Sequence, residues 1–284
     1  MTQKVFSDLL REAHQAVAAG GRVALCQIVR TEGSTPGKAG WKLLVRPGGE
    51  ALGNLGGGAF EALVRDDALH LLAAESPVPA VKRYYFTEDA VRGEATGMVC
   101  GGLAEVFLEV LAPPPLLAIC GGGPVGQALA AAGSLGGFDL MVAEDRDEFT
   151  RAELFPPGTL VERVDRSYSR DFLAGHSHRD LYVAIVTRCW ETDLAALAAL
   201  LRQAPPVLRY LGLMGSHRKI ERVRSEVEKQ GHSLEGVPFT APIGLPLGGS
   251  SPGEIAIAIL AEIIQQRRSA PAAAKPGPRR LRRG

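Results

Sequence analysis

The sequence predicts an α/β protein in which a smaller N-terminal α+β domain is joined to a C-terminal domain built on a Rossmann-type parallel sheet. Three observations lead to this prediction. Apolar strand-like segments alternate with helical patterns through the second half of the chain, a glycine-rich turn follows the first of these strands, and three consecutive prolines precede it. Such alternation is typical of a parallel sheet covered by helices on both faces. A chain of 284 residues is long enough for two domains with separate cores.

The first half of the chain predicts two helices and four strands. Apolar residues recur at helical spacing in 5–19, which ends at two glycines, and again in 59–74, directly after a glycine-rich loop. Short apolar runs predict strands at 22–30, 41–46, 81–86 and 106–111. Because three prolines can continue neither a helix nor a central strand, we expect an N-terminal domain over 1–112 and a stiff linker at 113–115.

The second half predicts five strands that alternate with four helices. The strands are expected at 116–120, 139–143, 159–164, 181–187 and 207–213, and the helices at 125–135, 194–203, 219–230 and 252–268. The last helix has a well-defined beginning, because Ser251 can cap it and Glu254 can complete a capping box. We expect the C-terminal domain to span 116–268, and the Ala-, Pro- and Arg-rich residues 269–284 to form a disordered basic tail.

Composition and charge argue against nucleic-acid and membrane partners. Hydrophobic residues make up 46% of the chain, but no apolar run approaches the roughly eighteen residues of a membrane span. The net charge is +1, yet the tail carries five of the 32 basic residues, so the rest of the chain is acidic overall and lacks a basic footprint. No signal-peptide core follows Met1, and the four cysteines show no paired spacing. We therefore expect a cytoplasmic protein with reduced thiols.

The glycine-rich turn of the second half has the spacing of a dinucleotide-binding loop. Gly121, Gly123 and Gly126 form a GxGxxG pattern between a predicted strand and a predicted helix. Asp145 follows the next strand, about two dozen residues further on, where an acid can accept hydrogen bonds from ribose hydroxyls. Arg146 comes directly after it and can reach a phosphate instead. The alternative is that these glycines serve only tight packing of helix against strand.

A second glycine-rich loop lies in the N-terminal half, before the helix expected at 59–74. Gly56, Gly57 and Gly58 allow the backbone to approach an anion closely, and the helix start directs N–H groups at it. Two such loops in one chain suggest a large phosphorylated ligand. Two later strand ends add candidates to the crevice of the parallel sheet, namely Arg188 and the pair Gly215 and Ser216. The alternative for the latter pair is a solvated first turn of a helix.

Cysteine chemistry is expected mainly at Cys100, which precedes Gly101 and Gly102. A thiol on such exposed backbone can act as a nucleophile or as a soft metal ligand. Cys189 ranks second because it lies in a predicted loop, whereas two further cysteines lie inside apolar strands and are expected to be inert, Cys26 and Cys120. The six histidines form no metal-binding pattern, so we expect no zinc or iron site made by the protein alone.

Eight short motifs occur in order along both predicted domains: 32–36, 53–58 with Glu61, 98–102, 121–126, 145–146, 215–219, 241–245 and 251–256. Together they resemble the XdhC/CoxI family, accessory factors for xanthine dehydrogenase and related molybdenum hydroxylases. The resemblance implies a protein that binds molybdenum cofactor, protects it during sulfuration by a cysteine desulfurase and delivers it to the apo-hydroxylase. Gly37 departs from the family, many members of which carry Arg at this position, and Ala59 stands where some relatives carry Cys.

The resemblance implies roles for the candidate residues. Gly56, Gly57 and Gly58 would bind the anionic cofactor through their backbone, and Cys100 would contact molybdenum or relay sulfur. Gly101 and Gly102, which follow Cys100, are further candidates for binding the cofactor. A homodimer is expected for a carrier of this kind. Two alternatives remain, both of which use the Rossmann domain: an NAD(P)-dependent oxidoreductase, and a regulatory module that senses NAD(P) or another nucleotide. No Tyr-x-x-x-Lys or acid-paired histidine supports the oxidoreductase, although hydride transfer needs a group to handle a proton.

Overall fold

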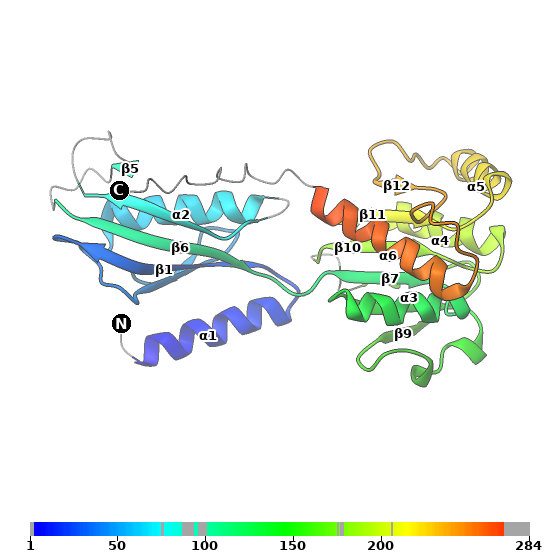
Figure 1. Cartoon of the computed structure of the whole chain (residues 1–284), viewed down its shortest axis with the longest axis horizontal. Helices are drawn as coiled ribbons and strands as arrows, with labels where there is room; N and C mark the ends of the chain where they lie inside the picture. Colours follow the sequence, from blue (N-terminus) through cyan, green and yellow to red (C-terminus); the bar gives the residue numbers. More distant parts are fainter. Residues whose placement is uncertain are drawn as a thin grey trace, which may run out of the picture. The chain divides into compact units, whose positions relative to one another are not determined.

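The computed structural model describes residues 3–74, 77–86, 94–95, 101–174, 176, 179–205 and 207–269. The chain divides into two compact units, Met1–Pro113 and Pro114–Gly284 (Figure 1). The division falls within the three prolines that are expected to form the linker. Cys100 and residues 270–284 of the expected tail lie outside the described residues.

The N-terminal unit is built on a six-stranded sheet in the order β3-β2-β1-β6-β4-β5. Antiparallel pairs join β1 to β2 and to β6, β2 to β3, and β4 to β6, while β4 and β5 pair in parallel. The elements are α1 (Gln3–Ala18), β1 (Val23–Glu32), β2 (Lys42–Val45), β3 (Ala51–Gly53), α2 (Gly58–Ala73), β4 (Ala80–Tyr85), β5 (Glu94–Ala95) and β6 (Leu103–Leu111). This is the mixed α+β domain that the sequence predicts.

Alternating side chains of the central strands pack against two different helices. Cys26 and Ile28 of β1 pack against α2, whose Phe60 and Val64 belong to the same buried cluster. Val23 of β1 belongs instead to a smaller cluster with Leu9 and Ala13 of α1 and Leu44 of β2. Because successive side chains of a strand point to opposite faces, the two helices cover opposite sides of the sheet. The glycine loop directly precedes α2 in the chain, so it lies at the N-terminal end of that helix.

The C-terminal unit is a parallel sheet in the order β12-β11-β10-β7-β8-β9, in which each of these neighbouring strands pairs in parallel with the next. Its strands are β7 (Leu116–Cys120), β8 (Asp139–Glu144), β9 (Leu160–Arg163), β10 (Leu181–Ile185), β11 (Leu208–Leu213) and β12 (Phe239–Thr240). Its helices are α3 (Pro124–Leu135), α4 (Trp190–Gln203), α5 (His217–Lys229) and α6 (Pro252–Ser269), with short 3-10 turns at Asp147–Phe149 and Ala152–Leu154. Numbered within the unit, the order is 3-2-1-4-5-6, that of a Rossmann fold.

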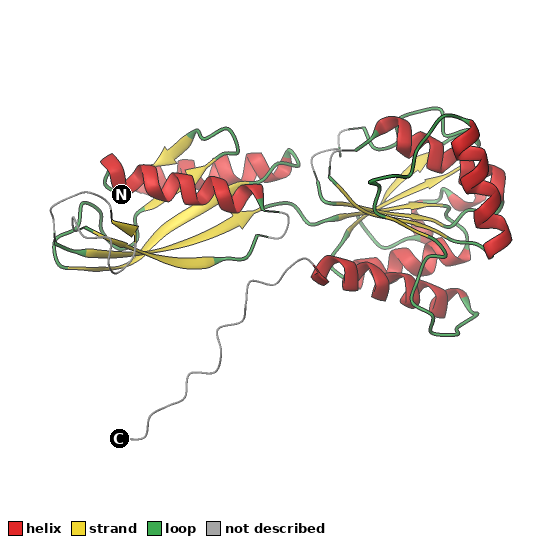
Figure 2. Ribbon diagram, turned by 90° about the horizontal axis from the view of Figure 1, so that it is seen from above, coloured by secondary structure: helices red, strands yellow, loops and turns green. Residues whose placement is uncertain are grey.

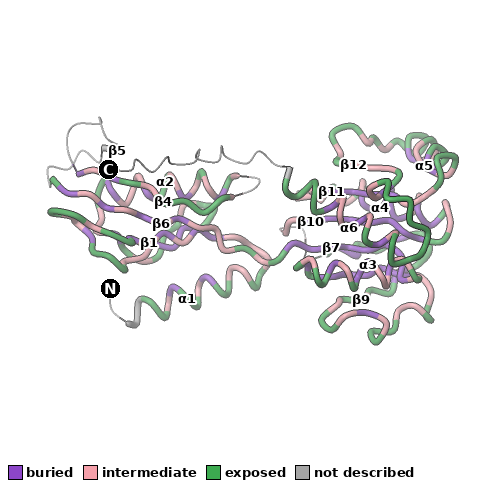
Figure 3. Tube along the Cα trace, in the orientation of Figure 1, coloured by how far each residue is buried: buried purple, intermediate pink, exposed green. Residues whose placement is uncertain are grey.

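Helices cover both faces of this sheet, as Figure 2 shows. α3 packs with α6 on one face and α4 packs with α5 on the other. The two central strands β7 and β10 are buried along their whole length (Figure 3), which explains why both read as continuous apolar runs. The strand order reverses between β7 and β10, so the crevice of this fold opens at the carboxyl ends of these two strands.

Most predicted elements are confirmed, and the errors have physical reasons. α4 begins at Trp190 rather than 194, because Thr192 and Asp193 of its first turn are polar yet buried and break the apolar periodicity. β10 correspondingly ends at Ile185 instead of 187, and β6 begins at Leu103 instead of 106. Three strands escape prediction, since two or three residues give no period to detect: β3, β5 and β12.

The capping box predicted for the last helix is confirmed. The Glu254 backbone N–H donates to Ser251 Oγ at 3.3 Å, and Glu254 Oε2 accepts from the Ser251 N–H at 2.9 Å. Such reciprocal bonds satisfy two N–H groups that a helix start otherwise leaves unpaired.

Candidate functional site

The glycine loop before α2 has a backbone conformation that only glycine adopts without strain. Gly56, Gly57 and Gly58 have φ angles of 120°, 74° and 64°, all in the left-handed region. Two of the loop's N–H groups are already used: that of Leu55 donates to Glu61 Oε2 at 3.0 Å, and that of Gly56 donates to Asn54 Oδ1. Gly57 caps α2 and has no side chain with which to do so, so the first N–H groups of α2 stay available to a ligand.

Backbone contacts join this loop to two other predicted motifs. A Cβ on Gly37 would lie 2.1 Å from the Leu55 carbonyl oxygen, and one on Gly102 would lie 2.2 Å from the Ser34 carbonyl oxygen. Ser34 and Gly101 also form a β-bridge. Residues 32–37, 54–58 and 101–102 therefore form one compact group, here called the glycine cluster. The contact at Gly37 leaves no room for a side chain in this backbone arrangement.

Among the described residues, nothing covers one side of the glycine cluster. In the described part of the chain, no atom lies within 4 Å of the Cβ position of Gly57, Gly58 or Gly101. The structure thus brings together five of the predicted cofactor-binding residues, Gly56, Gly57, Gly58, Gly101 and Gly102. Gly58 and Gly101 are the exposed members of this set, whereas the Gly101 N–H donates to the Phe86 carbonyl oxygen at 2.7 Å and Gly102 is buried. Cys100, the predicted catalytic residue, precedes Gly101 in the chain but lies outside the described residues.

In the C-terminal unit, two glycines of the GxGxxG turn have a packing role. A Cβ on Gly126 would lie 1.9 Å from the Gly121 carbonyl oxygen, and one on Gly121, whose φ is 116°, would lie 2.8 Å from the Val186 carbonyl oxygen. Gly123 differs, because its Cβ would meet Arg146 Nη2 at an ordinary 3.5 Å. Gly121 and Gly126 therefore serve tight packing of helix against strand, which was the alternative to ligand binding. Gly123 lies on the accessible side of the turn.

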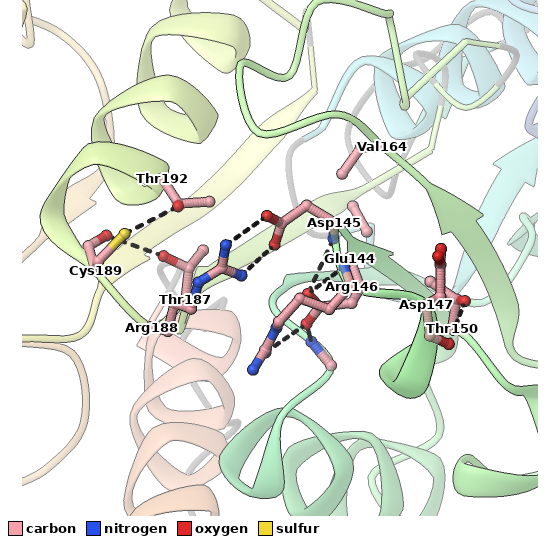
Figure 4. Close-up of polar contacts among 12 residues, drawn as sticks. Glu144, Asp145, Arg146, Asp147, Thr150, Val164, Thr187, Arg188, Cys189 and Thr192 are labelled. Carbon is pink, nitrogen blue, oxygen red and sulfur yellow. Dashed lines mark hydrogen bonds and ion pairs between the residues drawn. The ribbon is translucent and has the colours of Figure 1, made fainter.

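Glu144, the last residue of β8, locks the glycine turn from one side (Figure 4). Its side chain is 1% exposed, and its carboxylate accepts hydrogen bonds from the backbone N–H groups of Gly122 at 2.6 Å and of Asp145 and Arg146 at 3.0 Å. The Arg146 guanidinium adds two more, from Nε and Nη2, both at 2.9 Å. A buried carboxylate with five donors is fully satisfied.

Asp145 and Arg188, both predicted to bind cofactor, contact each other. Arg188 Nη1 and Nη2 donate to the two Asp145 carboxylate oxygens at 2.7 and 2.8 Å, which joins the ends of β8 and β10 (Figure 4). Partial burial by itself raises the pKa of Asp145, but the hydrogen bonds and charge of Arg188 outweigh it, so the pKa lies below its ordinary value. Neither oxygen of Asp145 faces the solvent freely, since its side chain is 6% exposed.

A buried ion pair joins the beginnings of α4 and α5. Lys219 forms an ion pair with Asp193, which is fully buried and also accepts a hydrogen bond from Thr187 Oγ1 at 2.6 Å. Burial raises the pKa of Asp193 above its ordinary value, although Lys219 and Thr187 oppose the shift. Ser216 caps α5, with its Oγ accepting from the Lys219 N–H at 3.4 Å. The charge of Lys219 is thus used inside the unit rather than offered to a ligand.

Lys219 also explains Gly215, another predicted cofactor-binding residue. A Cβ on Gly215 would lie 2.9 Å from Lys219 Cδ, so glycine gives the lysine stem its path to Asp193. Sequence reasoning does not find Asp193. Its position in the first turn of a helix is the available signal, but the predicted helix begins at 194, one residue after Asp193.

The described cysteines divide as the sequence predicts. Cys26 and Cys120 are fully buried, and burial is the main reason that the pKa of each thiol is raised, for Cys26 to about 12. Cys189 is half-buried at the N-cap of α4, with its Sγ 3.1 Å from Thr192 Oγ1.

Neither a metal-binding cluster nor a membrane-spanning helix occurs among the described residues. No group of three or more His, Cys, Asp and Glu side chains among them is placed to hold a metal ion. Within the same ranges, every helix is too short or too polar to cross a bilayer.

Comparison with known proteins identifies the family. The sequence model described as "XdhC Rossmann domain" matches residues 117–263, more than half of the chain, and the model described as "XdhC and CoxI family" matches residues 16–85. The chain therefore belongs to the XdhC and CoxI family.

Similar proteins include YqeB of Escherichia coli strain K12, named an uncharacterized protein, which is 35% identical over 87% of this chain and 44% of its own length. A Bacillus subtilis strain 168 protein, whose name describes it as a probable subunit of xanthine dehydrogenase, is 29% identical over 58% of this chain and 46% of its own. The chain thus spans less than half the length of these curated relatives. A solved Bacillus halodurans chain, described as a xanthine dehydrogenase, shares 20% identity, with a TM-score of 0.49 over 94% of this chain and 98% of its own.

Proposed function

We propose that this protein is an accessory factor that binds molybdenum cofactor, supports its sulfuration and delivers it to an apo molybdenum hydroxylase of the xanthine dehydrogenase type. Membership of the XdhC and CoxI family supports a role in the maturation of such an enzyme. The Bacillus subtilis relative, named as a probable xanthine dehydrogenase subunit, supports the same class of partner. The cofactor is cargo in this proposal, so the protein acts as a carrier rather than as a turnover enzyme.

One observation carries the proposal, namely the open side of the glycine cluster. Among the described residues, no atom beyond the chain neighbours lies within 4 Å of the Cβ position of Gly57, Gly58 or Gly101, which supports close approach of a ligand to the backbone there. The N–H groups at the start of α2 suit the phosphate that the cofactor carries, because they are donors and because the helix dipole is positive there. The cluster thereby fits an anionic ligand of large size.

Cys100 is the proposed reactive residue. It immediately precedes Gly101 in the chain, and a soft thiolate suits either contact with molybdenum or relay of sulfur from a cysteine desulfurase. The desulfurase and the apo-hydroxylase are the proposed partners, and a homodimer is the proposed carrier.

Co-expression tests this function. An apo-hydroxylase of the xanthine dehydrogenase type is produced with the wild-type chain, with Cys100→Ala, or without the chain, and its activity and cyanide-releasable sulfur are measured. We expect active, sulfurated hydroxylase with the wild-type chain and at least a tenfold loss with Cys100→Ala. Equal activity with and without the chain contradicts the proposed function, whereas full activity with Cys100→Ala removes the role of that thiol alone.

A further inference from the structure

The C-terminal unit has the strand order and glycine turn of a dinucleotide-binding fold. In such a fold, the residues at the end of β8 decide which kind of dinucleotide binds. In such folds an acid at this position binds the hydroxyls of the adenosine ribose, and an arginine nearby accommodates a 2′-phosphate instead. The sequence contains both residue types in succession, in Glu144, Asp145 and Arg146. The contacts of these three residues distinguish the two cases.

Neither acid is available to a ribose. A carboxylate offers about four acceptor positions, and that of Glu144 already receives five hydrogen bonds while its side chain is 1% exposed. Asp145 is 6% exposed and directs both oxygens to Arg188. Binding a diol would require breaking one of these charge-assisted arrangements, which are about twice as strong as neutral hydrogen bonds.

Arg146 is a cationic group that the end of β8 offers to a ligand. Its side chain is 26% exposed, and Glu144 occupies two of its five N–H donors. The guanidinium lies over the Phe149 ring at 4.2 Å, and its Nη2 comes within 3.5 Å of the Cβ position of Gly123. Glu144 and Phe149 therefore hold this cation beside the accessible side of the glycine turn, with donors left to bind a phosphate.

We infer that Arg146 selects a dinucleotide that carries a phosphate on its adenosine ribose, so that the C-terminal unit binds NADP(H)-type rather than NAD(H)-type ligands. Gly123 lets the diphosphate approach the start of α3, and Arg146 binds the 2′-phosphate. Glu144 acts as a positioning residue that fixes the arginine. This inference goes beyond the proposed cofactor-carrier function and does not depend on it.

Calorimetric titration of the full chain with four probes tests the inference. The probes form two matched pairs that differ by the 2′-phosphate alone: 2′,5′-ADP against 5′-AMP, and NADP⁺ against NAD⁺. We expect the phosphorylated member of each pair to bind at least tenfold more tightly, since charge-assisted contacts of this kind are strong. Equal affinities within each pair, a preference for the unphosphorylated member, or no binding of any probe at millimolar concentration would overturn the inference.

Two variants locate the selectivity. Arg146→Gln should bring NADP⁺ down to the affinity of NAD⁺ and leave 5′-AMP unchanged. Arg209→Gln is the matched control, because Arg209 has a similar exposure of 24% and pairs with Asp180 at the beginning of β10, on the opposite edge of the sheet. It should keep the full preference. If Arg146→Gln does not fold, the four wild-type titrations still decide the inference. Molybdenum and pterin retention is measured separately, so failure of one proposal is distinguishable from failure of the other.

Discussion

Glu144 and Asp145 are adjacent in the chain, yet each holds a different arginine. Glu144 is fully buried and fixes Arg146 together with the glycine turn, whereas Asp145 reaches across to Arg188. Which of the two neighbouring acidic side chains points into the core depends on the backbone conformation at the end of β8. The sequence alone does not give that conformation. The sequence therefore places an acidic pair at the end of β8 and assigns ribose binding to Asp145, whereas the structure pairs Asp145 with Arg188.

The Asp145–Arg188 pair should make stability depend on pH in the acid range. Because the folded-state pKa of Asp145 is lowered, its contribution is present above the unfolded-state pKa, near 4, and is lost as the pH falls through the folded value. Asp145→Asn should cost about 1 kcal/mol at pH 7, and this difference should shrink between pH 4 and pH 2. Urea unfolding at several pH values measures it.

Asp147→Asn is the control for that measurement. Asp147 is also paired with an arginine, Arg163, at 2.7 Å, but its side chain is 88% exposed. Solvent screens such a pair, so the variant should match the wild type within about 0.5 kcal/mol. A larger effect of Asp147→Asn than of Asp145→Asn would contradict the account of this edge.

Thiol reactivity separates the described cysteines. Cys26 and Cys120 are fully buried with raised pKa values, so native protein treated with iodoacetamide at pH 8 should leave both unmodified. Cys189 should be alkylated at least tenfold faster, which peptide mass spectrometry can follow. Modification of Cys26 or Cys120 ahead of Cys189 would show that the packing described for β1 or β7 is wrong.

At the scale of elements, the GxGxxG turn offers a direct test of packing. Gly126→Ala places a Cβ 1.9 Å from a backbone oxygen, and we expect it to destabilise the C-terminal unit by about 3 kcal/mol or more. Gly123→Ala meets only ordinary contact and should cost less than about 1 kcal/mol. Denaturant titration followed by circular dichroism compares the two. Equal losses would mean that Gly126 has no special packing role.

A helix or strand is predictable from the sequence when its apolar and polar residues follow a clear pattern of burial. β7 reads correctly at both ends because all of its residues are buried and turn residues bound it. The start of α4 is predicted four residues late because polar Thr192 and Asp193 are buried by contacts with other elements. The partner of Asp193 is Lys219, on the next helix, and no local pattern links two residues that far apart. The periodic patterns of a sequence do not reveal long-range polar pairs of this kind.

The glycine cluster gives a prediction for cargo binding at the same scale. Gly57→Ala should cost about 1–3 kcal/mol, because φ 74° with ψ −174° is a backbone region that essentially only glycine adopts, while a methyl group on the side left open by the described residues should lower retention of molybdenum and pterin several-fold. Gly158→Ala is the matched control: Gly158 has φ 86° and open surroundings, but it lies in the C-terminal unit. It should have a similar effect on stability and none on retention. Equal retention by both variants would exclude the cluster as the cargo surface.

At the scale of the whole molecule, the chain combines two units with different tasks in this account. The N-terminal unit has an open backbone surface suited to a large anionic cargo, and the C-terminal unit has a Rossmann sheet whose edge offers an arginine to a phosphate. The curated relatives are more than twice as long as the segments they share with this chain.

The measurement that tests the central claim most directly is the cofactor content of the purified chain. The protein is expressed anaerobically in a host that makes molybdenum cofactor, and molybdenum and the fluorescent oxidised pterin are assayed per chain. The account predicts near-stoichiometric amounts of both in the wild type and in Gly158→Ala, and a several-fold loss in Gly57→Ala. Wild-type protein without molybdenum and pterin, purified folded under these conditions, would contradict the claim that this chain carries the cofactor.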